Sequence, residues 1–279
     1  MRKTIVKTWI AAKAKRMTTT ALAIALLCPL VAEAGTFDHT HQELTDVLKE
    51  YVEKGLVDYS GLNQNPEGLD QYLRNLASVP LRKFQSWTKD QQLDFLINLY
   101  NAQTLRLILD NYPVDSIKDT GGLVTKPWDL KIADLFGKVV SLDTIEHGMI
   151  RKNYAESAIH FALVCAARGC PDLRAEAYQA GKLSEQLDDQ AQSFLASRKK
   201  NLIDLDNQVL HLSPIFKWYK EDFQEGSRGV AYYISRYFQG DVARRLRTEK
   251  FKIRYTNYDW SLNIQRPARV RTNRKSSNE

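Results

Sequence analysis

The hydrophobic pattern of this chain is strongest between Thr88 and Asn111. Apolar residues fall on nearly every side of a helix drawn through this stretch, which predicts a helix buried in the middle of a domain. Thr88 is followed three residues later by Gln91, a capping-box pattern that predicts where the helix begins. Pro113 predicts where it ends, because proline cannot continue a helix.

This predicted helix carries one polar stripe. Asp94, Asn98 and Asn101 are spaced by four and then three residues, so their side chains share one helix face. Two interpretations are open. The stripe either hydrogen-bonds neighbouring loops, because buried polar groups need partners, or forms a substrate-binding wall of a pocket. We favour the first and keep all three residues as substrate-binding candidates.

Shorter patterns lie on both sides of this helix. Helical spacing predicts further helices over 37–51, 66–76, 172–197 and 229–238, and short strands or hairpins are predicted over 56–59, 128–142, 159–165, 202–212 and 251–255. Helices and short strands in this irregular order predict an α+β fold, a single domain with a central buried helix and short antiparallel strands and hairpins.

The chain opens with the pattern of an export signal. Residues 1–16 carry six basic side chains, residues 21–31 are apolar, and Ala32, Glu33 and Ala34 fit the small-x-small pattern of a cleavage site. The apolar run is too short to span a bilayer, so we expect cleavage after Ala34 and no transmembrane segment afterwards. A retained N-terminal anchor is the alternative.

Cleavage would change the charge of the chain. Loss of 1–34 removes six basic residues and one acidic residue, which lowers the net charge from +7 to +2. A chain this close to neutral does not indicate a nucleic-acid partner. We therefore expect a periplasmic or secreted protein with an unknown small molecule or an envelope protein as its partner. The expected organisation is a signal peptide over 1–34, the α+β domain over 35–265 and a basic disordered tail over 266–279.

The residues with candidate chemistry gather in one short stretch, from Ser141 to Leu173. It holds two of the five histidines and two of the three cysteines, so any chemistry is expected there. A short helix is predicted over 141–151. A strand is predicted over 159–165, and a tight turn follows it.

Two interpretations of Cys165 and Cys170 are open. In an oxidising compartment, two cysteines across a tight turn predict a disulfide. The alternative is a reactive thiol. Pro171 suits the first position of a helix, which would make Cys170 its cap residue and lower the pKa of the thiol. Arg168 would act in the same direction and is a further substrate-binding candidate.

A thiol nucleophile needs a base, and His147 and His160 are the candidates. In an ideal strand, His160 and Cys165 would point to opposite faces. His147 follows Asp143 by one helical turn and has Glu146 beside it, and these two acids also fit a capping box. The histidines and cysteines lack the spacing of a zinc site, so no metal and no cofactor is expected.

Several short motifs are similar to those of a known family. They are Val57 to Tyr59, Ile97 to Ala102, Ser141 to Asp143 with Ile145 to His147, His160 to Leu163 with Cys165, Cys170 with Pro171, Ile215 to Tyr219 with Asp222 and Phe223, and Tyr258 to Trp260. Over 57–260 the chain thereby resembles the DUF547 family, a domain of unknown function found in exported bacterial proteins and in plants. It departs from the family at Arg168 and Gly169, where small polar residues are usual. The resemblance implies a shared fold and no established activity.

Two functions remain open from the sequence. The first, narrowly favoured, is a non-catalytic module that binds a ligand or a protein and contains a structural disulfide between Cys165 and Cys170. The second is a thiol-dependent hydrolase or acyl transferase, by analogy with papain-like and transglutaminase-like enzymes. In that case Cys170 is the nucleophile and His147 or His160 is the base.

Overall fold

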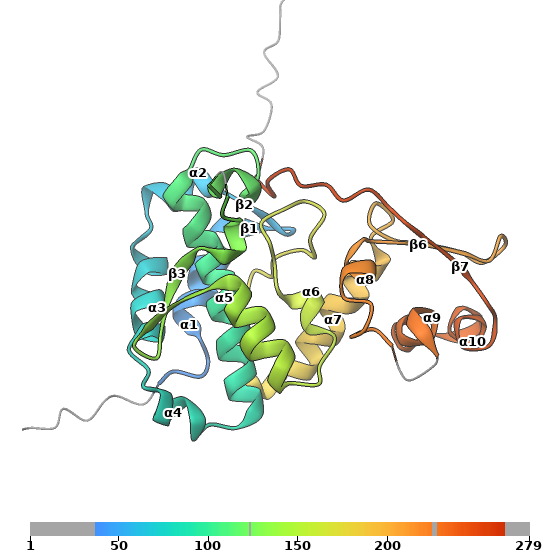
Figure 1. The fold of residues 1–279 in the computed structure, drawn as a ribbon, viewed down its shortest axis with the longest axis horizontal. Coiled ribbons are helices and arrows are strands. Elements are labelled where there is room, and N and C mark those ends of the chain that lie inside the picture. Colours follow the sequence, from blue (N-terminus) through green and yellow to red (C-terminus); the bar gives the residue numbers. More distant parts are fainter. Residues whose placement is uncertain (1–36, 123, 225–227, 266–279) are drawn as a thin grey trace, which may run out of the picture. The chain divides into compact units, whose positions relative to one another are not determined.

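The long helix predicted from the hydrophobic pattern is α5 (Lys89–Asn111), and the rest of the fold is arranged around it (Figure 1). The computed structural model describes residues 37–122, 124–224 and 228–265. The signal peptide predicted over 1–34 and the tail predicted over 266–279 lie outside these residues. The described residues combine helices with small sheets, so the predicted α+β class is confirmed.

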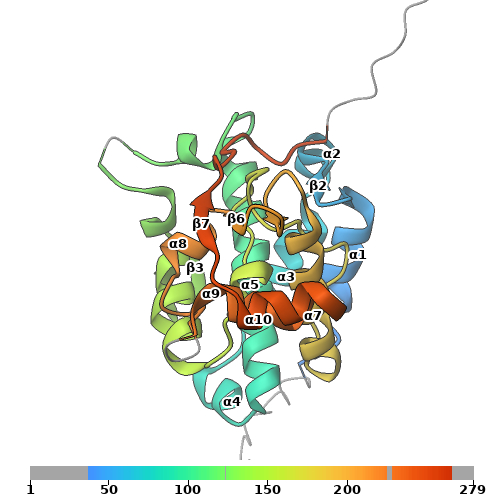
Figure 2. The same cartoon turned by 90° about the vertical axis from the view of Figure 1, so that its right-hand side faces the viewer.

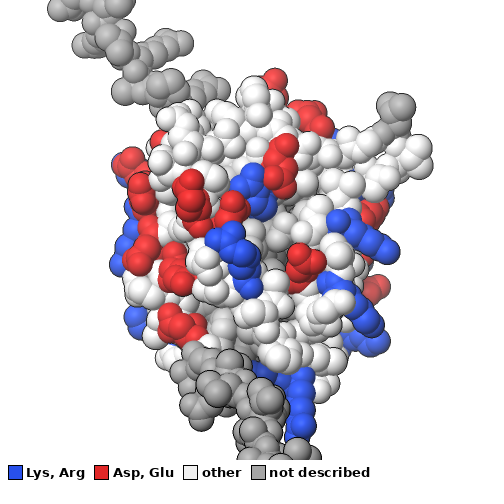
Figure 3. Space-filling model, turned by 90° about the vertical axis from the view of Figure 1, so that its left-hand side faces the viewer, with Lys and Arg blue, Asp and Glu red and all other residues white. Residues whose placement is uncertain are grey.

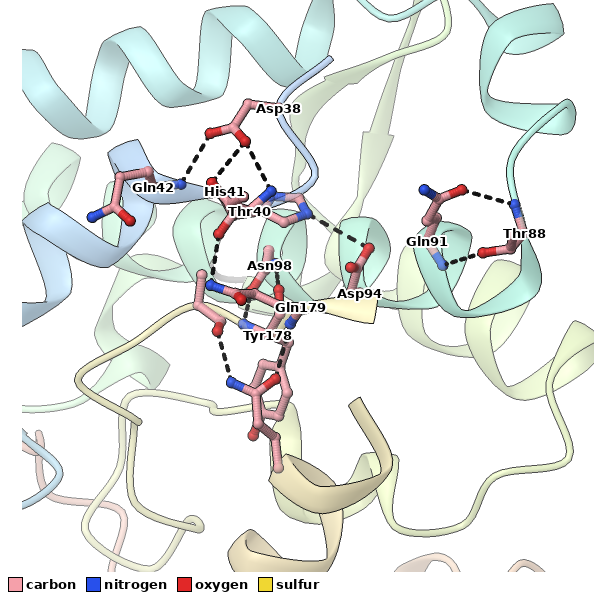
Figure 4. Close-up of polar contacts among 12 residues, drawn as sticks. Asp38, Thr40, His41, Gln42, Thr88, Gln91, Asp94, Asn98, Tyr178 and Gln179 are labelled. Carbon is pink, nitrogen blue, oxygen red and sulfur yellow. Dashed lines mark hydrogen bonds and ion pairs between the residues drawn. The ribbon is translucent and has the colours of Figure 1, made fainter. Parts of the chain in front are cut away.

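The start of α5 is fixed by the predicted capping box. The Gln91 backbone N–H donates to Thr88 Oγ1 at 3.2 Å, and the Thr88 N–H donates to Gln91 Oε1 at 3.0 Å (Figure 4). Side chains on every face of the helix are buried, including Phe95, Ile97 and Ile108. This burial explains the absence of an amphipathic pattern, because a helix in the centre of a domain has no solvent face.

Helices from both ends of the chain surround α5. In Figure 1, α3 lies on one side of it and α6 and α7 on the other. The helices are α1 (Gln42–Tyr51), α2 (Tyr59–Gln64), α3 (Glu67–Ala77), α4 (Leu81–Gln85), α6 (Ile159–Ala162), α7 (Leu183–Ala196), α8 (Ile215–Trp218), α9 (Gly229–Ile234) and α10 (Gly240–Thr248). The 3-10 turns are η1 (Ile117–Thr120), η2 (Pro127–Asp129), η4 (Ala180–Lys182) and η5 (Ser235–Tyr237), and η3 (Thr144–Arg151) is a π-helix. In the part of the chain that the structure describes, none of these helices has the length and hydrophobicity needed to cross a membrane.

The strands form small sheets, most of them hairpins. β1 (Val52–Glu53) pairs with β2 (Leu56–Val57), β3 (Lys131–Leu135) with β4 (Lys138–Ser141), and β5 (Leu202–Asp204) with β6 (Val209–Leu212), all antiparallel. β7 (Lys252–Tyr255) instead pairs with β6 in parallel, which departs from the antiparallel arrangement expected from the sequence. The reason is the crossover through α9 and α10, which returns the chain in the same direction. Figure 2 shows β6 and β7 together, with α9 and α10 below them in that view.

The strand predicted over 159–165 is wrong, because its first part is the short helix α6 (Ile159–Ala162). Every residue from 159 to 164 is buried, so the apolar run does not distinguish a strand from a buried helix. His160 therefore lies on a helical turn. Side chains alternate between two faces only along a strand, so His160 is not turned away from Cys165 by that alternation.

The helix predicted to begin at Pro171 is also wrong. The chain is irregular over 171–179, and α7 begins only at Leu183. Side chains, and not the backbone of a helix, form hydrogen bonds with the backbone N–H and carbonyl groups of this segment. The Tyr178 N–H donates to Asn98 Oδ1 at 2.9 Å, and Asn98 Nδ2 donates to the Tyr178 carbonyl at 2.8 Å. Cys170 is therefore not a helix cap, and no helix N-terminus acts on its sulfur.

Residues 257–265 close the fold by pairing with segments far away in the sequence. The Leu262 N–H donates to the Asp115 carbonyl at 2.7 Å, and the Asn263 N–H donates to the Ala166 carbonyl at 3.1 Å. The Val57 N–H in turn donates to the Asn263 carbonyl at 2.8 Å. This last described segment thus holds β2, the loop after α5 and the loop after α6 together.

Acidic and basic side chains both occur on the face that Figure 3 shows. Some of the charged groups pair between helices. Arg106 on α5 lies 3.1 Å from Asp70 on α3 and 2.7 Å from Asp110 one turn along its own helix. Such partly exposed pairs contribute little to stability and serve mainly to balance charge.

Candidate functional site

A cavity of about 280 Å³ lies where the loops after α5, α6 and α8 meet the segment 257–265. Six aromatic side chains line it: Tyr100, Trp128, Trp218, Tyr219, Tyr258 and Trp260. The five residues that the sequence offers as catalytic candidates, Cys165, Cys170, His147, His160 and Glu146, line the same cavity. The clustering expected from the stretch 141–173 is therefore present in three dimensions.

Cys165 and Cys170 lie side by side in the cavity wall. Their sulfur atoms are 2.08 Å apart, a disulfide distance, and their Cα atoms are 6.2 Å apart. The Tyr258 hydroxyl lies 3.1 Å from the sulfur of Cys165 and 3.0 Å from that of Cys170. One phenol hydroxyl therefore contacts both sulfurs.

Asp222 connects His160 to Arg151. His160 Nε2 lies 2.6 Å from Asp222 Oδ2, and Arg151 forms a bidentate pair with the same carboxylate at 2.6 and 2.9 Å. Burial alone would raise the pKa of Asp222. The hydrogen bonds from Arg151 and His160 outweigh burial, so its pKa lies below the ordinary value and the carboxylate is ionised at neutral pH.

His160 is held as a neutral imidazole. Burial lowers its pKa to about 4, because desolvation of the charged ring outweighs the attraction of Asp222. A neutral ring donates its Nε2–H to the Asp222 carboxylate. Tyr219 stacks on the ring, with centroids 3.8 Å apart. The result is an oriented histidine–carboxylate pair, which is an arrangement that can support proton transfer.

Glu146 enters the cavity from η3. Its side chain is buried, and its Oε1 accepts a hydrogen bond from the Tyr219 hydroxyl at 2.6 Å. Burial, followed by the negative charge of Glu146, raises the pKa of Tyr219. The capping box predicted for Asp143 and Glu146 is wrong, because Asp143 makes no capping hydrogen bond. Ser141 Oγ accepts the Thr144 N–H instead, at 3.1 Å, which leaves Glu146 available to the cavity.

His147 lies nearer the surface, on the same π-helix as Glu146. Its Nδ1 lies 2.7 Å from Arg151 Nη1, and its Nε2 lies 3.7 Å from Asp143 Oδ1. Arg151 therefore contacts both His147 and the Asp222 carboxylate that orients His160. π-helical turns occur often at functional sites, and here the turn presents Glu146 and His147 to one cavity.

The four substrate-binding candidates lie elsewhere and are not among the cavity-lining residues. Asn101 is buried, with its Nδ2 donating to the Ala162 carbonyl at 2.9 Å and its Oδ1 accepting the Val164 N–H at 2.9 Å. Asn98 forms the equivalent pair with Tyr178. Arg168 donates to the Ile264 carbonyl at 2.7 Å, and Asp94 faces His41 at 3.5 Å.

Comparison with known families agrees with the resemblance seen in the sequence. Residues 84–195 match the family described as "Protein of unknown function, DUF547". The chain contains a DUF547 domain. No curated protein and no solved structure matches the chain.

The DUF547 match covers only part of the cavity. It includes η3, α6 and the cysteine pair, and it ends before the cavity residues Tyr219, Tyr258 and Trp260 and before Asp222, which contacts His160. Sequence reasoning did not select Asp222 or Arg151 as site residues. The motif that ends in Asp222 and Phe223 was a signal in the sequence that could have indicated Asp222. Its pairing with His160, 62 residues away, depends on the fold.

Proposed function

We propose that the cavity of this DUF547 protein binds a small, uncharged, polar ligand with an apolar face, of which a sugar ring is the best example. The observation that carries this proposal is the combination of six aromatic side chains with carboxylates around one cavity of about 280 Å³. Aromatic rings bind the apolar face of such a ligand, and carboxylate oxygens accept hydrogen bonds from its hydroxyl groups.

The aromatic wall has a surface open to a ligand. Trp218, Tyr258 and Trp260 pack together, with centroids 4.8 Å apart for the first pair and 4.5 Å for the second. Trp218 nevertheless remains 48 % exposed. A large aromatic ring that is supported from behind and exposed in front supports a role in contact with a ligand, because binding would remove its apolar face from water.

The charged groups favour a ligand that donates hydrogen bonds. Three acidic side chains line the cavity, those of Asp129, Asp143 and Glu146. The same lining includes one lysine side chain, that of Lys126. Asp129, Asp143 and Lys126 are exposed, whereas Glu146 is buried deeper, beside the Tyr219 hydroxyl. Excess negative charge disfavours an anionic ligand.

Binding of a ligand is tested by tryptophan fluorescence, because Trp128, Trp218 and Trp260 all line the cavity. Glucose, N-acetylglucosamine and maltose are the probes. We expect a saturable change with at least one of them. Trp218→Ala is expected to weaken its binding at least about tenfold, which corresponds to about 1.4 kcal/mol. Leu81→Ala, at a residue that is 46 % exposed and outside the cavity lining, is the control and leaves binding unchanged. A flat titration with every sugar contradicts the proposal.

A second candidate function, a thiol-dependent enzyme, is favoured by one specific observation. The cysteine pair and the neutral His160 line the same cavity, and Asp222 orients that histidine. A reduced Cys170 or Cys165 would complete a cysteine, histidine and carboxylate set. A disulfide would remove the thiolate that this chemistry needs, which is why we place binding first.

The two candidates differ in the state of the cysteines in the exported protein. We propose that the chain is exported and that cleavage leaves Gly35 as the first residue, as the pattern in 1–34 supports. We expect the protein from the periplasm to have the intact mass of residues 35–279 and no titratable thiol after denaturation. Two free thiols, one of them with a pKa well below about 8.5, would favour the enzyme instead. A mass that includes residues 1–34 would contradict cleavage.

A further inference from the structure

A second group of polar side chains lies outside the cavity, where the first described residues meet α5. His39 Nδ1, His41 Nε2 and both carboxylate oxygens of Asp94 are buried, and none of them has a hydrogen-bond partner among the described residues. One possible ligand atom from each of these three side chains lies within 4.8 Å of the others. Buried polar atoms without partners are costly, so a cluster of them calls for a ligand.

The two histidines are held so that they face the same point. His41 adopts a left-handed conformation, with φ 49° and ψ 39°. The Asp38 carboxylate fixes this bend by accepting the Thr40 N–H at 2.9 Å and the Gln42 N–H at 3.3 Å (Figure 4). His39 and His41 are therefore brought against Asp94 by a defined turn at the start of α1.

His41 also has the support that metal-binding histidines usually have. Its Nδ1 lies 2.7 Å from the Tyr72 hydroxyl, so the ring is oriented with Nε2 directed at Asp94. Figure 4 shows His41 pointing toward Asp94. A hydrogen bond at one ring nitrogen fixes the orientation of the other nitrogen toward a metal and raises its basicity.

Aromatic rings enclose the cluster. Phe37 packs against His39 and His41 with centroid distances of 5.1 and 5.4 Å, and Trp87 packs against His39 at 4.5 Å. Phe95 closes the group behind Phe37 at 5.5 Å. Such a surrounding limits access of water, and polar interactions inside it are correspondingly stronger.

A simple ion pair does not account for the cluster. His41 Nε2 and Asp94 Oδ1 are 3.5 Å apart, whereas a charge-assisted hydrogen bond is about 2.7–2.9 Å long. Such a pair would also leave His39 Nδ1 without a partner. Ligand atoms bound to one tetrahedral zinc ion at about 2.0–2.1 Å lie about 3.3 Å from one another. The observed 3.5 Å is close to that spacing, and the ligand atom of His39 lies within 4.8 Å of the other two.

We propose that His39, His41 and Asp94 form a binding site for a divalent transition metal ion of the zinc class. Two imidazole nitrogens and one carboxylate oxygen match the ligand preferences of zinc and leave a further position for water. The hard ions calcium and magnesium, which prefer all-oxygen sites, are excluded by the two imidazoles. Because the ligands come from the segment before α1 and from α5, the ion would fasten the start of the domain to its central helix. This site is independent of the proposed function of the cavity.

Metal binding is tested on the exported protein without a histidine tag, which is first dialysed against EDTA to remove bound metal. Zinc is then added as the only metal. We expect one equivalent of zinc to remain bound after removal of free metal. The melting temperature should rise by about 5 °C or more at a hundredfold excess over Kd, whereas calcium produces no rise. Cobalt(II) should give visible absorption bands of a site with nitrogen and oxygen ligands. Wild-type protein that retains no zinc and shows no thermal shift would overturn the proposal.

Variants assign the ligands. Asp94→Asn keeps the size of the side chain and removes its charge, and His39→Asn removes one imidazole. Each should lower zinc affinity at least about tenfold and reduce the thermal shift. His211→Asn, the same change at a partly exposed histidine on β6, is the matched control and should bind like wild type. If Asp94→Asn and His39→Asn fold and bind zinc as tightly as this control, the site is wrong. If either fails to fold, the wild-type stoichiometry and the cobalt spectrum still decide.

Discussion

Replacement of Asn101 by Ala is expected to lower the free energy of unfolding by about 3 kcal/mol. The amide bonds the Ala162 carbonyl and the Val164 N–H, both at 2.9 Å, and it is buried. Without it, a carbonyl and an N–H remain buried and unpaired, and each such loss costs about 1–3 kcal/mol. Chemical denaturation of the purified protein measures the change.

Asn111→Ala is the matched control for this prediction. Asn111 lies on the same helix and is exposed, and its one side-chain hydrogen bond among the described residues goes to the Leu107 carbonyl of its own helix, at 2.9 Å. Its replacement is expected to change stability by less than about 0.5 kcal/mol. If Asn101→Ala proves no more destabilising than Asn111→Ala, then the buried amide does not hold α6 and its following loop to α5.

A fall in pH from about 6.5 to about 4 is expected to reduce stability by about 3 kcal/mol through His160. Burial lowers the pKa of His160 in the folded protein to about 4, against an ordinary value of 6.5. Between these two values the unfolded chain binds a proton that the folded protein does not bind. The contribution of His160 is therefore complete above pH about 6.5 and is lost as the pH falls toward 4. The lowered pKa of Asp222 keeps its carboxylate ionised over most of this range.

His160→Gln tests the pH dependence, because Gln can still donate a hydrogen bond but does not titrate. The readout is the slope of unfolding free energy against pH, which a loss of packing alone would not change. We expect a steeper slope in wild type than in His160→Gln between pH about 6.5 and about 4. Asn111→Ala, which removes no titratable group, should retain the wild-type slope. Parallel curves for wild type and His160→Gln would show that His160 is not held neutral by burial.

The parts of this fold that the sequence predicts are those set by local patterns. The buried helix α5, its capping box and the hairpins β3–β4 and β5–β6 all follow from periodicity and turn residues over short distances. The five catalytic candidates within 141–173 that line the cavity were predictable for the same reason. One short stretch holds them, and its turns keep them close.

The errors and omissions come from distant contacts. Residues 171–179 do not form a helix. Asn98, eighty residues earlier, instead hydrogen-bonds the backbone of Tyr178 in this segment. Trp218 and Trp260 complete the cavity from the far end of the chain, and Asp222 orients His160 from there. Asp94 shares a stripe with Asn98 in the sequence, yet its neighbours His39 and His41 are fixed by a left-handed turn that no periodicity reveals. In each case the partner is determined by the assembled fold.

The pairing of residues 257–265 with β2 and with the loops after α5 and α6 has a consequence for the order of assembly. A polypeptide emerges from the ribosome with its N-terminus first. The helices around α5 are therefore available long before Tyr258 and Trp260, which belong to the cavity wall. A ligand site in this cavity cannot exist on a partly synthesised chain. Completion of the binding surface belongs to the last stage of biosynthesis, after the segment that closes it has been made.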